Sequence, residues 1–270
     1  MTKVEAFAPA KLNLTLHVTG QRADGYHLLD SVVVFADIGD RLTLRPYDVM
    51  SINVTGPFAP GVPTDARNLA WRAAEAAGVS CEITLDKVLP HAAGIGGGSS
   101  DAAAVLRCAD GLGGQVPSDV AALGADVPVC MTLGAQRMSG IGDMLSRLTL
   151  PKAWLVLVTP DVKLATAPVF EALETKTNPP MAEIGPFNGF YAFVAWLKSQ
   201  RNDLEPPARA LVPEISEALA ALANAPVARM SGSGPTCFGV FPSDDVARAA
   251  ARRIAEQHPS WWVQAARMIA

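Results

Sequence analysis

The sequence predicts an α+β fold with two lobes, and three observations support this prediction. Hairpin-like runs of strands alternate with helical stretches along the 270 residues, an order typical of α+β proteins. Half of the residues are hydrophobic, so a substantial core can form. A strongly apolar strand pattern at residues 154–159 begins a second series of elements, and we therefore expect lobes of residues 1–150 and 151–270.

The first strand pattern covers residues 11–18, where polar and apolar side chains alternate strictly. This alternation is typical of a half-buried strand. It places Lys11 and Asn13 on one face of the strand, two residues apart, where both side chains can reach one ligand.

The remaining elements follow from the same kinds of pattern. Strands are expected in the run after Pro128 and at residues 31–38, 41–45, 51–55, 81–88, 154–159, 228–231, 236–241 and 261–268. Helices are expected at residues 68–77, 100–109, 120–123, 190–199, 213–223 and 244–258. Residues 175–189 are Pro-rich and carry no clear pattern.

Four glycines lie among the five residues from Gly94 to Gly98, after a strand pattern and just before a helical one. Glycine permits positive φ and lets a ligand approach the backbone closely. The N-terminus of a helix adds N–H groups without helical partners and a partial positive charge. Together these features predict a phosphate site and therefore a bound nucleotide.

Two known phosphate motifs do not fit this glycine loop. The Lys of a Walker A sequence is missing, and Ser99 stands where the third glycine of the dinucleotide fingerprint should fall. The alternative is a tight turn and a capped helix without a ligand. A turn does not need four glycines in five residues, so we favour the phosphate site.

The bulk properties exclude several classes of protein. The net charge of −4 argues against nucleic acid or an anionic membrane surface as the main partner. The chain has no apolar run of 18 residues without Pro or Gly and no signal-peptide core, so we expect a cytoplasmic protein. Four cysteines without metal-ligand spacing are expected as buried thiols: Cys81, Cys108, Cys130 and Cys237.

The motifs resemble one known family. Residues 90–104 resemble the P-x-x-x-G-L-G-S-S-A-A phosphate loop of the GHMP kinases, which act on galactose, homoserine, mevalonate and phosphomevalonate. The N-terminal motif of residues 9–16, together with Gly25-Tyr26-His27, is narrower and is similar to the 4-diphosphocytidyl-2-C-methyl-D-erythritol kinases. Later motifs of that family match in the same order at residues 124–129, 202–205 and 231–235.

The loop departs from the family pattern in two places. His91-Ala-Ala replaces a segment that more often carries glycine or valine, and Ile95 stands where leucine is usual. Neither change removes a backbone donor that a phosphate would need.

The resemblance implies a two-lobed GHMP kinase fold, with an N-terminal lobe like domain 2 of ribosomal protein S5 and a ferredoxin-like C-terminal lobe. It implies ATP-dependent phosphorylation of the C2 hydroxyl of 4-diphosphocytidyl-2-C-methyl-D-erythritol, in the non-mevalonate isoprenoid pathway. ATP is then the co-substrate and Mg²⁺ accompanies it, with no dedicated protein metal site. The partner is a small molecule with a cytidine diphosphate group, and the chain is expected to be a monomer or weak homodimer.

The resemblance also assigns roles to individual residues. Asp126 is the candidate base, and Lys11 is the candidate partner that orients it and neutralises the transferring phosphoryl group. Asn13 is expected to bond a substrate hydroxyl, and Tyr26 and His27 to bind the cytosine by stacking and hydrogen bonding. The residues expected to cradle the ATP phosphates are Pro90, Gly94, Ile95, Gly96, Gly97, Gly98, Ser99 and Ser100.

Several assignments stay open at this point. A second aromatic ring against the cytosine could come from Phe187, Phe190, Tyr191 or Phe193. Lys87 is either solvated or close to the nucleotide, Asn68 is a candidate helix cap, and residues 232–234 form either a plain turn or part of the site. The alternatives for the whole chain are another small-molecule GHMP kinase or a non-catalytic nucleotide-binding protein on the same fold.

Overall fold

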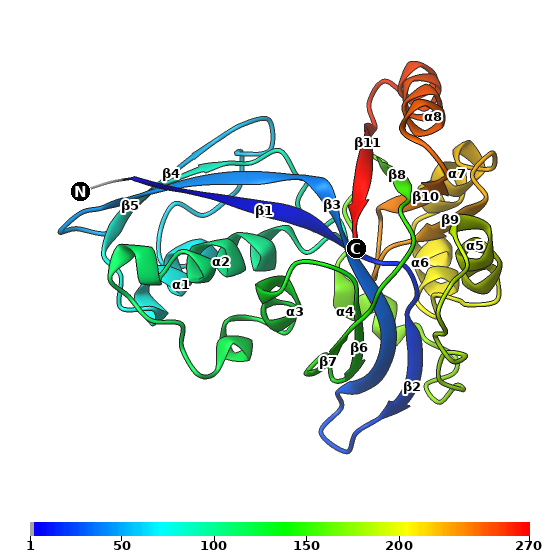
Figure 1. The fold of residues 1–270 in the computed structure, drawn as a ribbon, viewed down its shortest axis with the longest axis horizontal. Coiled ribbons are helices and arrows are strands. Elements are labelled where there is room, and N and C mark those ends of the chain that lie inside the picture. Colours follow the sequence, from blue (N-terminus) through cyan, green and yellow to red (C-terminus); the bar gives the residue numbers. More distant parts are fainter. Residues whose placement is uncertain (1–2) are drawn as a thin grey trace. The chain divides into compact units, whose positions relative to one another are not determined.

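The computed structural model describes residues 3–270 and divides into two compact units, each described here by itself. The first unit holds the chain up to Lys11 with residues 38–91 and 96–133, and the second holds residues 12–37, 92–95 and 134–270. The chain thus passes between the units after residues 11, 37, 91, 95 and 133. Figure 1 labels the helices and strands and colours the chain along its sequence. The expected lobe boundary at residue 150 stays a prediction.

The first unit is built on four paired strand segments and several helices. The strands are β1 (Val4–Asn13), which ends in the second unit, the last part of β3 (His27–Pro46), β4 (Ser51–Thr55) and β5 (Cys81–Asp86). In β3, residues 41–46 pair antiparallel with β5, and β4 pairs parallel with β5 on its other edge. The helices are α1 (Leu69–Ala76), α2 (Gly97–Arg107), α3 (Val127–Met131) and the short 3₁₀ turns Asp110–Leu112 and Val120–Leu123.

Helix α2 is the central element of the first unit. Its residues from Ser100 to Leu106 are all buried, which fits its Ala-rich composition because small side chains allow neighbours to pack on every side. It packs against α1 and α3. The predicted helix at residues 100–109 therefore exists, but it begins at Gly97, directly after Gly96 with a φ of 64°.

The second unit contains an antiparallel sheet in the order β11-β8-β10-β9. Its strands are β8 (Trp154–Thr159), β9 (Val227–Met230), β10 (Cys237–Phe241) and β11 (Trp262–Ile269). Numbered along the chain this order is 4-1-3-2, with helices after the first and third strands, which is the ferredoxin-like arrangement that the resemblance implied. The helices are α4 (Thr166–Glu171), α5 (Phe190–Lys198), α6 (Glu205–Leu211), α7 (Glu214–Ala221) and α8 (Asp244–Gln257).

The other strands of the second unit form one sheet with the first part of β3, to which β2 and β6 pair directly. They are β2 (His17–Gln21), β6 (Gln136–Gly140) and β7 (Met144–Arg147), the last of which pairs with β6. The core of this unit joins Leu16 and Val18 to apolar residues of β8, β10, α7 and α8. No helix within residues 3–270 is long and apolar enough to cross a membrane.

Three strand predictions between residues 11 and 45 are wrong. Residues 11–18 do not form one half-buried strand, because the chain breaks between β1 and β2 and both faces are buried. The strands predicted at residues 31–38 and 41–45 are one strand, β3. Gly39 lies inside it because a side chain there would collide with the backbone carbonyl of Ala8, so this glycine serves a close approach and not a turn.

The run after Pro128 is helical and not a strand. Proline fits the first turn of a helix, since its missing N–H would have no helical partner there, and Pro128 occupies such a position in α3. The sequence patterns also missed α4, α6, β6 and β7, which are short elements of four to seven residues.

Candidate active site

Lys11 and Asp126 form an ion pair in the first unit. Lys11 lies in β1, and Asp126 directly precedes the first residue of α3. Lys11 Nζ is 3.0 Å from Asp126 Oδ2, and the lysine side chain is 5% exposed while the aspartate side chain is 38% exposed. A buried ammonium thus holds a carboxylate that solvent and ligands can reach.

The N-terminus of α2 lies against the same lysine. A Cβ added to Gly96 would come within 3.1 Å of Lys11 Cβ and Cε, so any side chain at this position would displace the lysine. The positive φ at Gly96 also favours glycine. The first turn of α2, from Gly97 to Ser99, therefore presents its N–H groups near a buried cation, an arrangement suited to a phosphate.

Ser99 and Ser100 differ in their surroundings. Ser99 is half-buried. Ser100 is fully buried, and its hydroxyl donates to the carbonyl of Pro9 at 2.8 Å while its N–H donates to Gly96 within the helix. The hydroxyl of Ser100 therefore fastens α2 to β1, while its N–H is used within the helix. The expected contact of Ser100 with phosphate stays a prediction.

A buried triad of Asp40, Lys87 and Asp101 lies beneath the first turn of α2. Lys87 Nζ donates to Asp40 Oδ2 and, at 2.9 Å, to Asp101 Oδ2. The other oxygen of Asp40 accepts the N–H groups of Val88 and Leu89 at 2.7 and 2.9 Å. Lys87 is thus not a solvated lysine, because its ammonium is buried and bonded to two carboxylates. Its expected place near the nucleotide stays a prediction.

The triad carries two carboxyl groups for one ammonium group. Burial raises the pKa of Asp101 to about 7, and the nearby carboxylate of Asp40 adds to this increase while Lys87 opposes it. The two carboxyl groups outweigh burial at Lys87 and raise its pKa, so the ammonium stays charged. Asp101 Oδ1 is buried without a hydrogen-bond partner among the described residues.

In the second unit, Asn13 belongs to a network that includes the glycine loop. Its N–H donates to Ser231 Oγ at 3.1 Å, and its side-chain Nδ2 donates to Ser31 Oγ at 2.8 Å. Ser231 Oγ in turn donates to the carbonyl of Gly94 at 3.0 Å. A Cβ on Gly94 would lie 2.6 Å from the Ser231 carbonyl, so residues 231–235 are packed directly on the loop and are not an isolated turn.

Tyr26 and His27 lie at the turn between β2 and β3. Tyr26 is 61% exposed. The His27 ring packs on Phe170, with ring centroids 4.8 Å apart, and its Nε2 is buried without a hydrogen-bond partner among residues 3–270. Burial lowers the pKa of His27, with Lys176 contributing, so the imidazole is neutral at pH 7 and can accept or donate a hydrogen bond.

The ring that packs on His27 belongs to Phe170, which is not one of the four rings considered for stacking on the cytosine. Phe193 is fully buried, Phe187 packs on Phe193 and Trp196, and Tyr191 is 75% exposed. Phe170 belongs to α4, a helix that the sequence patterns missed, so no signal in the sequence pointed to it.

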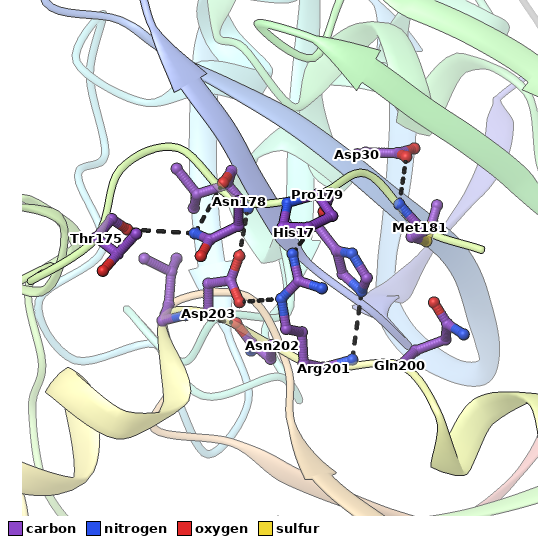
Figure 2. A network of polar contacts seen from close by, with 12 residues as sticks. His17, Asp30, Thr175, Asn178, Pro179, Met181, Gln200, Arg201, Asn202 and Asp203 are labelled. Atoms are coloured by element: carbon purple, nitrogen blue, oxygen red, sulfur yellow. Dashed lines mark hydrogen bonds and ion pairs between the residues drawn. The ribbon is translucent and has the colours of Figure 1, made fainter.

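The motif at residues 202–205 holds several backbone segments of the second unit together. Asn202 Nδ2 donates to the carbonyls of Met230 and Gly232, both at 2.8 Å. Asp203 accepts the N–H of Val18 at 2.7 Å and the guanidinium of Arg201 at 2.6 Å. Figure 2 shows the contact between Asp203 and Arg201 and the bonds that continue from there to the irregular segment before α5.

That irregular segment, residues 175–189, is fastened at several points, which Figure 2 shows. Asn178 donates through its N–H and its side chain to the carbonyl of Val18, and Met181 donates its N–H to Asp30. The guanidinium of Arg201 binds the Pro179 carbonyl at 2.6 Å. These long-range contacts replace the regular structure that the segment lacks.

The expected site residues therefore occupy both units. Those of the first unit are Lys11, Pro90, Gly96, Gly97, Gly98, Ser99, Ser100 and Asp126. Those of the second unit are Asn13, Tyr26, His27, Gly94 and Ile95. Ile95 is buried in the core, so its side chain packs and only its backbone is available to a ligand. Asn68 is confirmed as a helix cap, since it accepts the N–H of Ala70 at 2.9 Å.

Comparisons with known proteins agree with this fold. The model of the GHMP kinases N terminal domain matches residues 66–146, and the model of the GHMP kinases C terminal domain matches residues 191–260. A crystal structure of homoserine kinase from Cytophaga hutchinsonii has a TM-score of 0.70 at 18% identity, over 98% of this chain and 95% of that one, which shows the shared fold. The chain is a GHMP kinase.

Relatives with higher sequence identity indicate which of the GHMP kinases this chain belongs to. The protein from Cereibacter sphaeroides named 4-diphosphocytidyl-2-C-methyl-D-erythritol kinase is 54% identical over 98% of this chain and 99% of its own length. A relative of the same name from Dinoroseobacter shibae is 55% identical over 96% and 93%. A crystal structure of 4-(cytidine 5'-diphospho)-2C-methyl-D-erythritol kinase matches with a TM-score of 0.78 at 32% identity, over 99% and 100%. The chain belongs to the 4-diphosphocytidyl-2-C-methyl-D-erythritol kinase family.

Proposed function

We propose that this chain transfers the γ-phosphoryl group of ATP to the C2 hydroxyl of 4-diphosphocytidyl-2-C-methyl-D-erythritol, giving the 2-phosphate and ADP. The observation that carries the proposal is the Lys11–Asp126 ion pair beside the glycine-flanked N-terminus of α2. It combines a reachable carboxylate, a cation and a phosphate-binding helix end, which are the parts that phosphoryl transfer needs. The reaction belongs to the non-mevalonate route to isoprenoid precursors.

In this mechanism the ATP phosphates lie against the N–H groups of residues 97–99. The C2 oxygen of the substrate attacks the γ-phosphorus, its proton passes to the Asp126 carboxylate, and ADP leaves. Lys11 keeps the carboxylate in place and offsets negative charge on the transferring group. The phosphoryl group passes directly from ATP to the substrate, so the mechanism needs no covalent intermediate on the enzyme.

Mg²⁺ bound with ATP would offset the negative charge of the phosphates. Within residues 3–270 no group of three or more His, Cys, Asp or Glu side chains is placed to hold a metal ion. Ser99, half-buried in the first turn of α2, is the candidate protein ligand, since a hydroxyl oxygen suits this hard cation.

The cytosine of the substrate is assigned to Tyr26 and His27. The exposed ring of Tyr26 offers a stacking face, and His27 beside it is assigned the hydrogen bond to the edge of the base. Asn13 is assigned to a hydroxyl of the methylerythritol part, since Ser31 and Ser231 orient it.

The experiment that tests the proposal is ATP-dependent ADP release with 4-diphosphocytidyl-2-C-methyl-D-erythritol beside mevalonate, phosphomevalonate, homoserine and galactose. We expect turnover with the cytidyl substrate alone. Turnover with a different member of the panel would retain Lys11 and Asp126 but discard the cytosine assignment. A folded protein that is silent on all five would contradict the proposed function.

A further inference from the structure

Arg107, the last residue of α2, reaches two other elements of the first unit with one guanidinium. Its Nη1 donates to the carbonyl of Cys130 at 2.6 Å, and its Nη2 donates to the carbonyl of Phe7 at 2.7 Å. Both bonds are short and charge-assisted, and they are partly buried. The sequence patterns assigned no role to this arginine.

The two carbonyls belong to the elements that carry the candidate catalytic pair. Phe7 lies in β1, four residues before Lys11. Cys130 lies in α3, four residues after Asp126. One side chain thus connects the strand that positions the ammonium with the helix that positions the carboxylate.

Helix α3 depends on such an anchor. Five residues are too few for a helix to be stable alone. The bond from the Cys130 N–H to the Asp126 carbonyl is long, at 3.3 Å. A guanidinium on the last turn satisfies a carbonyl that has no helical partner and interacts favourably with the negative end of the helix dipole.

We infer that Arg107 is a positioning residue for the Lys11–Asp126 pair. It holds β1 and α3 at the spacing that brings Lys11 Nζ to 3.0 Å from Asp126 Oδ2. An arginine suits this task because its rigid fork donates to two carbonyls at once, whereas the single ammonium of lysine does not reproduce the fork. The inference rests on the proposed function, since it assigns Arg107 to the pair proposed to carry out the phosphoryl transfer.

The test compares Arg107→Met and Arg107→Lys with Arg72→Met, a matched control at an exposed arginine on the neighbouring helix α1. Initial rates are measured against ATP and against the cytidyl substrate, below the melting temperature of every variant. We expect Arg107→Met to lower kcat about 10- to 100-fold with both KM values changed less than about threefold, because a small misplacement of reacting groups mainly slows the chemical step. Arg107→Lys should recover part of the loss, and Arg72→Met should match the wild type.

A double-mutant cycle separates positioning from a general loss of stability. Asp126→Asn removes the carboxylate through which Arg107 acts, so adding Arg107→Met to it should lower kcat by less than about twofold more. Unchanged kcat in folded Arg107→Met, or an equally large loss in the Asp126→Asn background, would overturn the inference. If Arg107→Met does not fold, Arg107→Lys becomes the test variant. A wild-type kcat in folded Arg107→Lys would then overturn the inference.

Failure of the proposed function gives a different result. A wild-type protein without ATP-dependent turnover of the cytidyl substrate would remove the proposed reaction itself. Wild-type turnover with unaffected Arg107 variants would remove only the positioning role.

Discussion

The chemistry proposed for this chain rests on the unequal environments of two charged residues, Lys11 and Asp126. Lys11 is buried against Gly96, so the mobility of its ammonium group is restricted. The Asp126 side chain is 38% exposed, so ligands can reach its carboxylate. A fixed cation beside a reachable carboxylate costs little reorganisation when a hydroxyl loses its proton. The proposed mechanism uses this asymmetry, and Gly96 leaves the space that the lysine of β1 occupies.

Asp126→Asn should keep the shape of the site and lose most of its turnover. We expect kcat to fall about 10²- to 10⁴-fold, because the amide cannot take the hydroxyl proton, while the ATP dissociation constant changes little. Initial rates and isothermal titration with ATP measure the two effects. Asp119→Asn, at an exposed cap of a 3₁₀ turn in the same unit, is the control. A normal rate in Asp126→Asn would remove Asp126 from the mechanism.

Asp101→Asn tests the charge balance of the buried triad. The raised pKa means that the folded state keeps a proton which the unfolded chain loses above pH 4, so stability falls as the pH rises from about 4 to about 7. Asparagine has no such proton, and Asp40 still neutralises Lys87. The free energy of unfolding of Asp101→Asn minus that of the wild type should therefore grow by roughly 2–4 kcal/mol between pH 4 and pH 8.

Urea unfolding at several pH values measures this difference. Asp110→Asn, an exposed aspartate of the same unit, should show no such trend. A constant difference between Asp101→Asn and the wild type would mean that Asp101 is ionised throughout the folded state.

At the scale of elements, order comes from side chains that bind distant backbone groups. Residues 175–189 have almost no regular structure, yet Asp30, Arg201 and the backbone of Val18 hold them at separate points (Figure 2). Arg229 likewise donates to the carbonyls of Leu14, Leu197 and Gln200. Such contacts satisfy buried backbone groups that no strand or helix partner reaches.

His17 makes this arrangement sensitive to acid. Its Nε2 accepts the N–H of Arg201, and burial lowers its pKa, with the positive charge of Arg201 contributing (Figure 2). The unfolded chain therefore binds a proton below about pH 6.5 that the folded chain binds only at lower pH, so His17 reduces stability as the pH falls through this range.

We expect His17→Gln to lessen the acid sensitivity of folding, since a glutamine oxygen can still accept the Arg201 N–H but takes up no proton. Thermal melts between pH 5 and pH 8 would show a smaller loss of melting temperature on the acid side than in the wild type. His91→Gln, at an exposed histidine, should leave the pH dependence unchanged. Parallel curves for His17→Gln and the wild type would contradict the assignment.

At the scale of the whole molecule, the two units are joined by the path of the chain itself. The chain crosses between them after residues 11, 37, 91, 95 and 133, and the single strand β3 contributes to the pairing in both. Neither unit is therefore one continuous stretch of sequence. We infer that the units depend on each other for folding.

This dependence predicts one unfolding transition. Leu85→Ala in the first unit and Phe238→Ala in the second both remove fully buried side chains, which costs about 2–5 kcal/mol each. We expect each variant to move the same single urea transition, seen alike by tryptophan fluorescence and circular dichroism. Two separated transitions, or a stable isolated fragment of residues 1–150, would contradict this expectation.

The local patterns predicted the fold in outline and failed at particular residues. Gly39 and Asp40 look like a turn, but the first permits a close approach of Ala8 and the second binds backbone N–H groups some 50 residues away. The run after Pro128 looks like a strand because it is apolar, yet this run and Pro128 belong to a five-residue helix. A period of two or 3.6 cannot be recognised in elements this short.

The sequence by itself determined the fold class, the phosphate-loop signature and the family, because these depend on residue types in a fixed local order. The glycine loop, the helix after it and the motif around Asp126 are recognised from the sequence alone. Only the tertiary structure decided that Lys87 is buried between two carboxylates, that Phe170 packs on His27 and that Arg107 ties β1 to α3. Each of these depends on residues far apart in the chain, and a local pattern carries no information about which distant group a buried side chain will meet.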